Sequence, residues 1–369
     1  NSTFMFSLMI GLCVGDATLG MLIANLGYDR LTISLPVFIS DTFHAQTEVI
    51  YLKESESRSN AGIVTFNHKL INQRKENLPM PAYCVTYEGT NLMKMRSLLF
   101  VPGDRPERFD KAAQSGADAI ILDLEDSVSS EHKQKARIKV AEFLMRPRNI
   151  TTLVRINPIQ EGLAIDDLRA ILPAKPDGLV QPKTEGSVSI RALVKMMGDN
   201  AVPVLPIASE TPNSIFELGS YGEVKDHLLG LTWGAEDLPA AIGAITSRQT
   251  DGSYTPPYEM VRSLLLFGAH AASVPAIETV YPAISDMSGL EAYVARGRRD
   301  GFTGMMAIHP AQIKSINDGF SPTEQELDRA KKIIDAFDKN PGVGALMVDG
   351  KMVDFPHLKQ AKKLIEQNQ

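Results

Sequence analysis

The chain has 369 residues, a length that suits one large domain plus a fragment, or two or three ordinary domains. Hydrophobic residues make up 44% and charged residues 22%, as in most soluble globular proteins, and the net charge of −6 argues against nucleic acid as a partner. The two cysteines lack metal-ligand spacing, which predicts free thiols in a reducing, cytoplasmic compartment.

The chain opens with an apolar stretch, residues 4–14, that we interpret as a buried amphipathic helix. No basic residue precedes it and no convincing cleavage site follows it, which disfavours a signal peptide. Asp16 interrupts the stretch too early for a membrane span, so we expect no attachment to a membrane.

Four strand-like runs follow, at residues 30–34, 41–52, 61–73 and 82–93. The second and third alternate polar and apolar residues with a period of two, which is typical of half-exposed antiparallel strands. A helix followed by such strands predicts an α+β unit over residues 1–94.

This unit resembles the second half of a MaoC-type hotdog hydratase, through the segments NSTFMFSLMIGLCVGD, DTFHAQTEV and SRSNAGIVTFNHKLINQR. The resemblance implies that the family's catalytic Asp and His belong to a first half that this segment does not contain. His44 and His68 lie in strand patterns and do not match those positions. We therefore expect a partial hotdog segment without hydratase activity.

From Arg96 onward, short apolar runs alternate with helical patterns. Eight strands are predicted, at 98–101, 119–122, 152–156, 178–180, 202–207, 228–232, 271–276 and 304–308. The helical patterns between them include 106–115, 130–144, 187–197, 258–269 and 288–299. The alternation predicts an α/β fold, a (β/α)8 TIM barrel over residues 95–320, rather than a doubly wound sheet with fewer strands.

Two further helices, 322–337 and 355–367, flank a hairpin that is expected to turn on Asp349-Gly350. We assign residues 321–369 to a C-terminal helical extension.

Charged or polar side chains follow most of the predicted strands, and parallel strands of a barrel bring such positions to one rim. They are Arg105, then Glu125 and Asp126, then Arg155 and Asn157, then Lys183, Glu210, the pair Glu236 and Asp237, and His309. Acids and cations that meet at a rim are costly to desolvate unless they pair or bind a metal. The carboxylates of Glu210 and Asp237, completed by water and substrate oxygens, suit Mg²⁺, and no His/Cys cluster favours zinc.

Residues 96–369 closely resemble the citrate lyase β-subunit-like family of the HpcH/HpaI aldolases. The segments that carry the resemblance are RSLLFVPGDRPERFDKAAQSGADAIILDLEDSV, LVRIN, QPKTEG, WGAEDL, GFTGMMAIHPAQI and KMVDFPHLKQA. The resemblance implies Mg²⁺ ligation by Glu210 and Asp237, and contact of Arg155 with the reacting oxygens. It also implies that Phe100 and Arg105 lie on the CoA side. Asp354, in the MVDFP segment, is implied to act in the site of a neighbouring subunit.

Other strand-end residues receive supporting roles. We expect Glu125 to orient Arg155 or a metal-bound water, and the backbone amides near Ala235 and Glu236 to bind the substrate carboxylate. Lys183 is interpreted as part of a rim ion pair or as a cationic partner of the acids around Arg155. His309 is expected to make a structural hydrogen bond, and Trp233 is expected to lie in the core. Asp354 would exchange a proton with the enolate carbon, which requires a partly dry carboxyl with a raised pKa.

The expected activity is a Mg²⁺-dependent carbon–carbon lyase acting on a 3-hydroxyacyl-CoA such as citramalyl-CoA, malyl-CoA or methylmalyl-CoA. The products would be acetyl-CoA or propionyl-CoA and a 2-oxo acid. A malyl-CoA thioesterase, the β subunit of citrate lyase and a non-catalytic CoA-binding subunit are the alternatives. If Asp354 serves a neighbour's site, the protein is expected to be a homo-oligomer, a trimer or a multiple of three.

Overall fold

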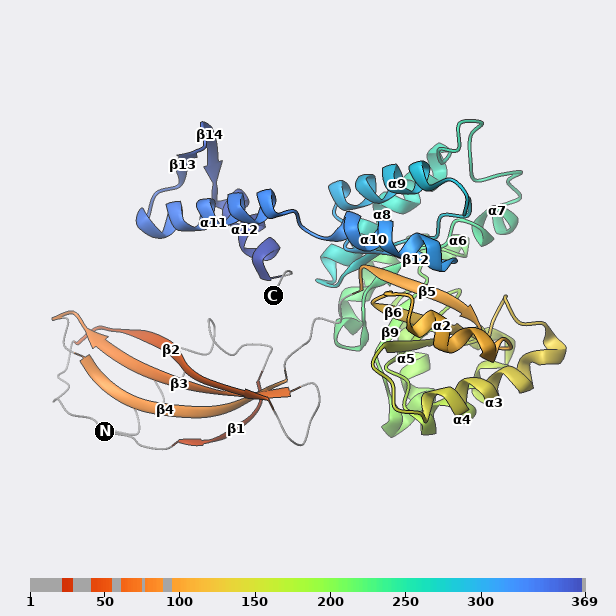
Figure 1. Cartoon of the computed structure of the whole chain (residues 1–369), viewed down its shortest axis with the longest axis horizontal. Coiled ribbons are helices and arrows are strands. Elements are labelled where there is room, and N and C mark those ends of the chain that lie inside the picture. Colours follow the sequence, from red (N-terminus) through yellow and green to blue (C-terminus); the bar gives the residue numbers. More distant parts are fainter. Residues whose placement is uncertain (1–21, 29–40, 55–60, 75–76, 89–94, 367–369) are drawn as a thin grey trace. The chain divides into compact units, whose positions relative to one another are not determined.

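The computed structural model describes residues 22–28, 41–54, 61–74, 77–88 and 95–366 (Figure 1). The chain divides into two compact units, Asn1–Met93 and Lys94–Gln369. The helix expected at residues 4–14 and the strand expected at 30–34 lie outside the described residues. No helix in the described part of the chain has the length and apolar content that a membrane crossing requires.

The described part of the first unit is a four-stranded antiparallel sheet with the order β1-β4-β3-β2. Its strands are β1 (Leu22–Tyr28), β2 (Phe43–Glu54), β3 (Ala61–Asn72) and β4 (Asn77–Glu88). Along residues 43–48 of β2, half-buried and exposed positions alternate, as the period-two pattern predicted. His44 is one of the exposed positions. The antiparallel strands are therefore confirmed, and the likeness to a hotdog hydratase stays a prediction.

The second unit contains an eight-stranded parallel sheet with the order β10-β11-β12-β5-β6-β7-β8-β9. The strands are β5 (Ser97–Pro102), β6 (Ala119–Asp123), β7 (Thr151–Arg155), β8 (Gly178–Gln181), β9 (Val204–Pro206), β10 (Leu231–Thr232), β11 (Ala276–Glu278) and β12 (Gly304–Ala307). Parallel bridges from Val204 to Leu228 and from Ile207 to Thr232 join the two outer strands. The sheet closes on itself, so the predicted (β/α)8 barrel is confirmed.

Helices follow the strands and cover the outside of the barrel (Figure 1). They are α2 (Phe109–Ala113), α3 (Lys133–Leu144), α4 (Ala164–Ile171), α5 (Gly186–Met197), α6 (Pro212–Phe216), α7 (Asp237–Ile242), α8 (Pro256–Ala271), α9 (Met287–Asp300) and α10 (Ile313–Phe320). Alternate strand residues such as Leu122 and Leu179 face these helices and form one continuous buried core with them. The strand residues between them, such as Asp123, face the inside of the barrel.

The seventh strand is the one that the sequence misplaced. The expected run 271–276 contains the end of α8 and a turn at Ser273, whose φ is 59°, whereas β11 begins only at Ala276. The strand ends in Glu278, which is buried and accepts hydrogen bonds from Trp233 Nε1 and Arg262 Nε. The prediction searched for apolar runs, and a strand that ends in a buried, paired acid does not match such a pattern. This explains why the predicted strand lies before the observed one.

The C-terminal extension consists of α11 (Glu324–Lys339), a hairpin of β13 (Ala345–Val348) and β14 (Lys351–Asp354), and α12 (Phe355–Glu366). We call this extension the arm. It has a small core of its own, formed by Ala330, Ile333, Phe337, Val348, Val353 and Ala361. Asp349 and Gly350 both have positive φ, as a two-residue hairpin turn requires, so the expected turn is confirmed.

Candidate active site

A cavity of about 840 Å³ lies at the C-terminal ends of the barrel strands. Five strand ends contribute polar lining: Asp123 of β6, Arg155 of β7, Glu210 beyond β9, residues 234–237 beyond β10 and Thr279 beyond β11. This end of a (β/α)8 barrel is where active sites are built, because loops and strand ends converge there. Six of the ten predicted rim residues line this cavity: Asp126, Arg155, Glu210, Glu236, Asp237 and His309. Arg105, Glu125, Asn157 and Lys183 are not among the lining residues.

Arg155 is held by the strand beside it. Asp123 and Arg155 are register partners on β6 and β7, and the guanidinium contacts both Asp123 oxygens at 2.7 Å. A third contact joins Arg155 Nη1 to Glu125 Oε2 at 2.9 Å. The guanidinium also lies 4.8 Å from the centre of the Phe100 ring. These ion pairs with Asp123 and Glu125 fix a cation at the cavity wall.

The two acids that hold Arg155 have opposite pKa shifts. Burial would raise the pKa of Asp123, but the hydrogen bond and charge of Arg155 outweigh it and hold that pKa below its usual value. For Glu125, burial dominates and raises the pKa to about 7, while Arg155 offsets part of the effect. Glu125 does not line the cavity but contacts Arg155, which does, and its orienting role stays a prediction.

Glu210 is a buried carboxylate with 5% of its surface exposed. Burial raises its pKa to about 8, a hydrogen bond from the Lys183 N–H opposes this, and the nearby charges of Glu125 and Asp237 add to it. The carboxylate lies against Gly234, where an added Cβ would stand 3.0 Å from both Cγ and Oε1 of Glu210. The glycine of the WGAED segment therefore makes room for this acid.

Glu210 and Asp237 fit a hard divalent cation. Both line the cavity, and Asp237 begins α7 with a pKa raised by burial and then by the charge of Asp126. A nearby cation would favour the ionised form of each acid. Among the described residues, no group of three or more His, Cys, Asp or Glu side chains forms a closed ligand set. Such an open, oxygen-only pair is what Mg²⁺ uses when water and substrate complete its coordination.

The residues expected on the CoA side divide into two groups. Phe100 lines the cavity, but Arg105 does not: it is exposed, with Nε 3.8 Å from Asp104 Oδ1. Arg108 and Lys111 line the cavity instead. These two follow Arg105 at three-residue intervals along the same helical segment. The spacing is visible in the sequence, but the prediction considered only Arg105.

Three other predictions concern the loops after β10 and β12. Ala235 and Glu236 line the cavity, where they were expected, and their contact with a substrate carboxylate stays a prediction. Trp233 is fully buried and belongs to the core. His309 lines the cavity, and its Nδ1 accepts a hydrogen bond from the Ala311 N–H at 3.2 Å, which is the structural role expected for it.

Asp354 ends β14 of the arm and is not among the residues that line the cavity. Its Oδ1 lies 2.5 Å from His357 Nδ1, and this hydrogen bond is the main reason that the Asp354 pKa is lowered. A proton donor was expected to have a raised pKa. The difference has a physical cause, because Asp354 is 40% exposed within a single chain and has a basic partner.

The chain is similar to known proteins over the residues that form the barrel. The family model HpcH/HpaI aldolase/citrate lyase matches residues 96–310. The citrate lyase subunit beta of Haemophilus influenzae is 31% identical over 287 residues, which cover 74% of this chain and 97% of that protein. A (3S)-malyl-CoA thioesterase of Cereibacter sphaeroides is 31% identical over 283 residues, covering 73% of this chain and 93% of the relative.

Solved structures show the same likeness. Protein CitE of Mycobacterium tuberculosis, in complex with magnesium, acetoacetate and coenzyme A, is similar with a TM-score of 0.65 and 31% identity, over 75% of this chain and 99% of that one. The citrate lyase beta subunit of M. tuberculosis with oxaloacetate and magnesium has a TM-score of 0.57 and 33% identity, over 63% and 100%. Both the sequence match and the barrel support one assignment: the chain belongs to the HpcH/HpaI aldolase/citrate lyase family.

Proposed function

We propose that the chain is a Mg²⁺-dependent carbon–carbon lyase that cleaves a 3-hydroxyacyl-CoA, with citramalyl-CoA, malyl-CoA and methylmalyl-CoA as the candidate substrates. The observation that carries the proposal is the meeting of three groups in one cavity: the fixed Arg155 guanidinium and the carboxylates of Glu210 and Asp237. Relatives whose structures contain magnesium with coenzyme A or oxaloacetate support the same chemistry.

In the cleavage direction, the substrate hydroxyl loses its proton to a base at the site or to solvent. The adjacent carbon–carbon bond then breaks, the hydroxyl carbon becomes the carbonyl of a 2-oxo acid, and the electron pair passes into the thioester enolate. That enolate takes up one proton at carbon to give acetyl-CoA or propionyl-CoA. A Mg²⁺ ion bound by Glu210 and Asp237 would supply Lewis-acid stabilisation of the hydroxyl oxygen.

The chain's own groups perform the remaining tasks. Arg155 is positively charged, faces the cavity and is oriented by Asp123, so it stabilises negative charge on the reacting oxygens. Its partners keep it in place before the substrate binds, which removes the cost of ordering it during the reaction. Phe100, Arg108 and Lys111 form an apolar and basic side of the cavity that suits an acyl-CoA.

The proton for the enolate carbon is assigned to Asp354 of a neighbouring subunit. Asp354 is 40% exposed and is not among the residues that line the cavity of its own chain, and both observations support this assignment. Docking of the arm against another chain would remove water from Asp354 and raise its pKa toward the range that a proton donor needs. The proposal therefore includes a homo-oligomer, a trimer or a multiple of three.

A thioesterase is the second candidate. The relative from Cereibacter sphaeroides, a (3S)-malyl-CoA thioesterase, has the same level of identity as the citrate lyase relatives. Hydrolysis would use the same cavity, with water attacking the thioester carbonyl instead of cleavage of the carbon–carbon bond.

Product analysis separates the two activities. The purified chain is incubated with Mg²⁺ and each of the three CoA esters, and the products are identified by mass spectrometry. A lyase gives acetyl-CoA or propionyl-CoA with a 2-oxo acid, whereas a thioesterase gives free CoA with the intact hydroxy acid. Glu210→Gln is the matched control, because it keeps the size of the side chain and removes one charged metal ligand. Absence of carbon–carbon cleavage for all three esters refutes the lyase.

A further inference from the structure

Lys183 has a backbone conformation that side chains rarely adopt, at the point where the chain leaves β8. Its φ of 49° lies in the left-handed region, which residues other than glycine avoid unless their surroundings hold them there. Thr184 holds this turn: its hydroxyl donates to the Gln181 carbonyl at 2.8 Å, and its N–H donates to the Ile207 carbonyl at 3.3 Å. The unusual conformation is thus tied to both β8 and β9.

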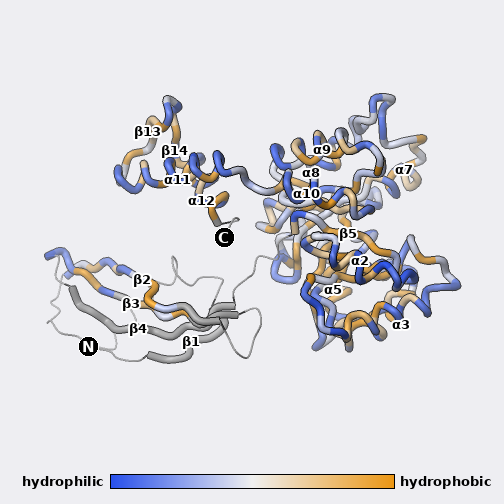
Figure 2. Tube along the Cα trace, in the orientation of Figure 1, coloured by the Kyte–Doolittle hydropathy of each residue, from blue (hydrophilic) through white to orange (hydrophobic). Residues whose placement is uncertain are grey.

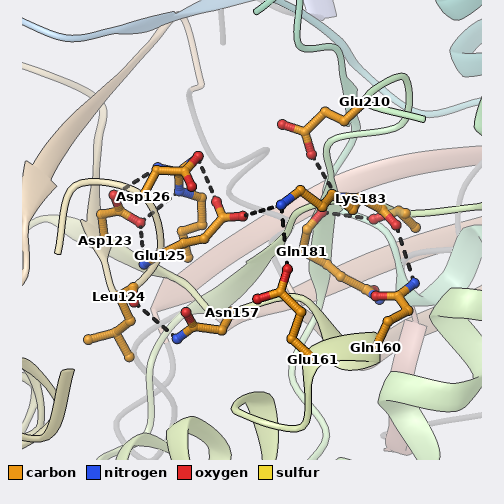
Figure 3. Close-up of polar contacts among 12 residues, drawn as sticks. Asp123, Leu124, Glu125, Asp126, Asn157, Gln160, Glu161, Gln181, Lys183 and Glu210 are labelled. Carbon is orange, nitrogen blue, oxygen red and sulfur yellow. Dashed lines mark hydrogen bonds and ion pairs between the residues drawn. The ribbon is translucent and has the colours of Figure 1, made fainter. Parts of the chain in front are cut away.

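The turn directs the Lys183 N–H toward Glu210. The N–H donates to Glu210 Oε2 at 2.6 Å, and Figure 3 shows the other carboxylate oxygen pointing away from Lys183. That second oxygen, Oε1, lies beside Gly234 at the cavity. The backbone therefore occupies one oxygen of the carboxylate and leaves the other for a ligand in the cavity. Hydrogen bonds of this kind orient metal ligands in proteins.

The side chain of Lys183 leaves the turn in a different direction. Its Nζ lies 3.8 Å from Glu125 Oε1 and 3.6 Å from Glu161 Oε1 (Figure 3). These are ionic contacts of a side chain that is 32% exposed, so solvent screens them. The backbone and the ammonium of this residue thus face different acids, and their effects can be separated by substitution.

We propose that Lys183 is a positioning residue for the metal centre, whose left-handed turn aims its N–H at Glu210 and so presents the second oxygen of that carboxylate to the cation. The proposal rests on the proposed Mg²⁺ site and deepens it. The ammonium is not the source of the effect, because a positive charge near the site opposes the binding of a cation.

Two substitutions at this position isolate the turn. Lys183→Gly and Lys183→Val both remove the ammonium, but glycine favours the left-handed conformation and a β-branched residue strongly disfavours it. Mg²⁺ binding to the purified full chain is measured by calorimetry at one pH. We expect a Kd equal to that of the parent or tighter for Lys183→Gly. For Lys183→Val we expect a Kd weaker than that of the glycine variant by about tenfold or more, where tenfold corresponds to about 1.4 kcal/mol.

Equal Mg²⁺ affinities of the glycine and valine variants, whether both are strong or both are weak, would overturn the inference. Thermal melting checks that each variant is folded. If Lys183→Val does not fold, Lys183→Ala takes its place, and a weaker affinity of alanine than of glycine supports the inference. A parent chain that binds no Mg²⁺ overturns the metal site and the inference together. Binding in the expected order by a chain without lyase activity supports the inference and refutes the proposed reaction.

Discussion

Arg155 combines more interactions than any single sequence pattern indicates. It contacts Asp123 through two bonds, Glu125 through one, and the face of the Phe100 ring. These contacts hold the Arg155 side chain in one orientation at the cavity. A guanidinium with two parallel bonds to one carboxylate has a direction that an ammonium lacks.

Arg155→Lys is therefore predicted to lower kcat by about 10²–10³-fold, the range found when one donor to a developing negative charge is lost. The positive charge remains, but its position relative to the reacting oxygens does not. Steady-state kinetics with the best CoA ester gives kcat and KM separately. Arg169→Lys is the control, because Arg169 is 73% exposed and pairs only weakly with Asp166 at 3.5 Å. A kcat of Arg155→Lys within tenfold of the parent would contradict the role of the guanidinium.

The raised pKa values of Glu125 and Glu210, about 7 and about 8, predict a pH-dependent stability. Because these pKa values are higher in the folded than in the unfolded chain, the folded state binds protons more tightly. Their contribution to stability is complete below about pH 4 and is lost as the pH rises through 7 to 8. Mg²⁺ needs the ionised carboxylate, so its stabilising effect has the opposite pH dependence.

We expect Mg²⁺ to raise the Tm clearly at pH 8.5 and only slightly at pH 6, as about a two- to three-unit change in pH spans the titration of these acids. Thermal unfolding with and without Mg²⁺ at the two pH values provides the measurement. Glu210→Gln should remove most of the difference. A Mg²⁺ effect on Tm that is equal at both pH values would show that Glu210 does not titrate in this range.

At this scale, the sequence predicted positions better than contacts. Arg155, Glu210 and Asp237 were found because charged residues directly after apolar runs must lie at one barrel rim. The role of Asp123 was missed, although its place one strand away from Arg155 in the same layer is a consequence of parallel register. The conformation of Lys183 had no signal in the sequence, because a left-handed lysine is set by its neighbours in space.

Among the secondary-structure elements, the short loop between β10 and α7 depends on the close approach of Gly234 to Glu210. An added methyl group would stand 3.0 Å from the Glu210 side chain and force that carboxylate to move. Gly234→Ala is predicted to weaken Mg²⁺ binding by about tenfold, equivalent to about 1.4 kcal/mol, with the barrel still folded.

Gly219→Ala is the matched control for this substitution. An added Cβ at Gly219 meets no atom within 4 Å, so neither metal affinity nor Tm should change appreciably. Calorimetric Mg²⁺ titration of both variants decides the matter. Unchanged affinity in Gly234→Ala would mean that Glu210 adjusts without cost, or that it is not a ligand.

The eight barrel strands were predicted in number and order, but their boundaries were not. Several observed strands are short, with β10 reduced to Leu231–Thr232 and β9 to Val204–Pro206, whereas the apolar runs around them are longer. Apolar residues beside a barrel strand are buried whether or not they join the hydrogen-bonded sheet. Burial pattern therefore locates a strand, and only the neighbouring strands decide where its pairing ends.

For the whole molecule, the sequence identified a barrel followed by an arm, and it assigned Asp354 to the site of another chain only through the family resemblance. The arm carries exposed apolar side chains near Asp354, with Met347 and Met352 exposed by 67% and 68%. In Figure 2 the hairpin of β13 and β14 includes hydrophobic segments. Exposed apolar side chains that gather in one place are typical of a surface that contacts a partner.

A shared site makes a specific prediction for mixed assemblies. Arg155→Ala removes the cation from the cavity of its own chain, and Asp354→Ala removes the proton donor that its arm provides. Each variant alone should be nearly inactive.

When the two are co-expressed with different tags and purified as mixed oligomers, a chain with intact Arg155 can receive an intact Asp354 from its neighbour. In a mixed cyclic trimer, whichever variant is present twice, one of the three sites is complete, so about a third of the parent activity should return. A site built within one chain has no such combination, so mixed oligomers without activity would place both residues in the same subunit.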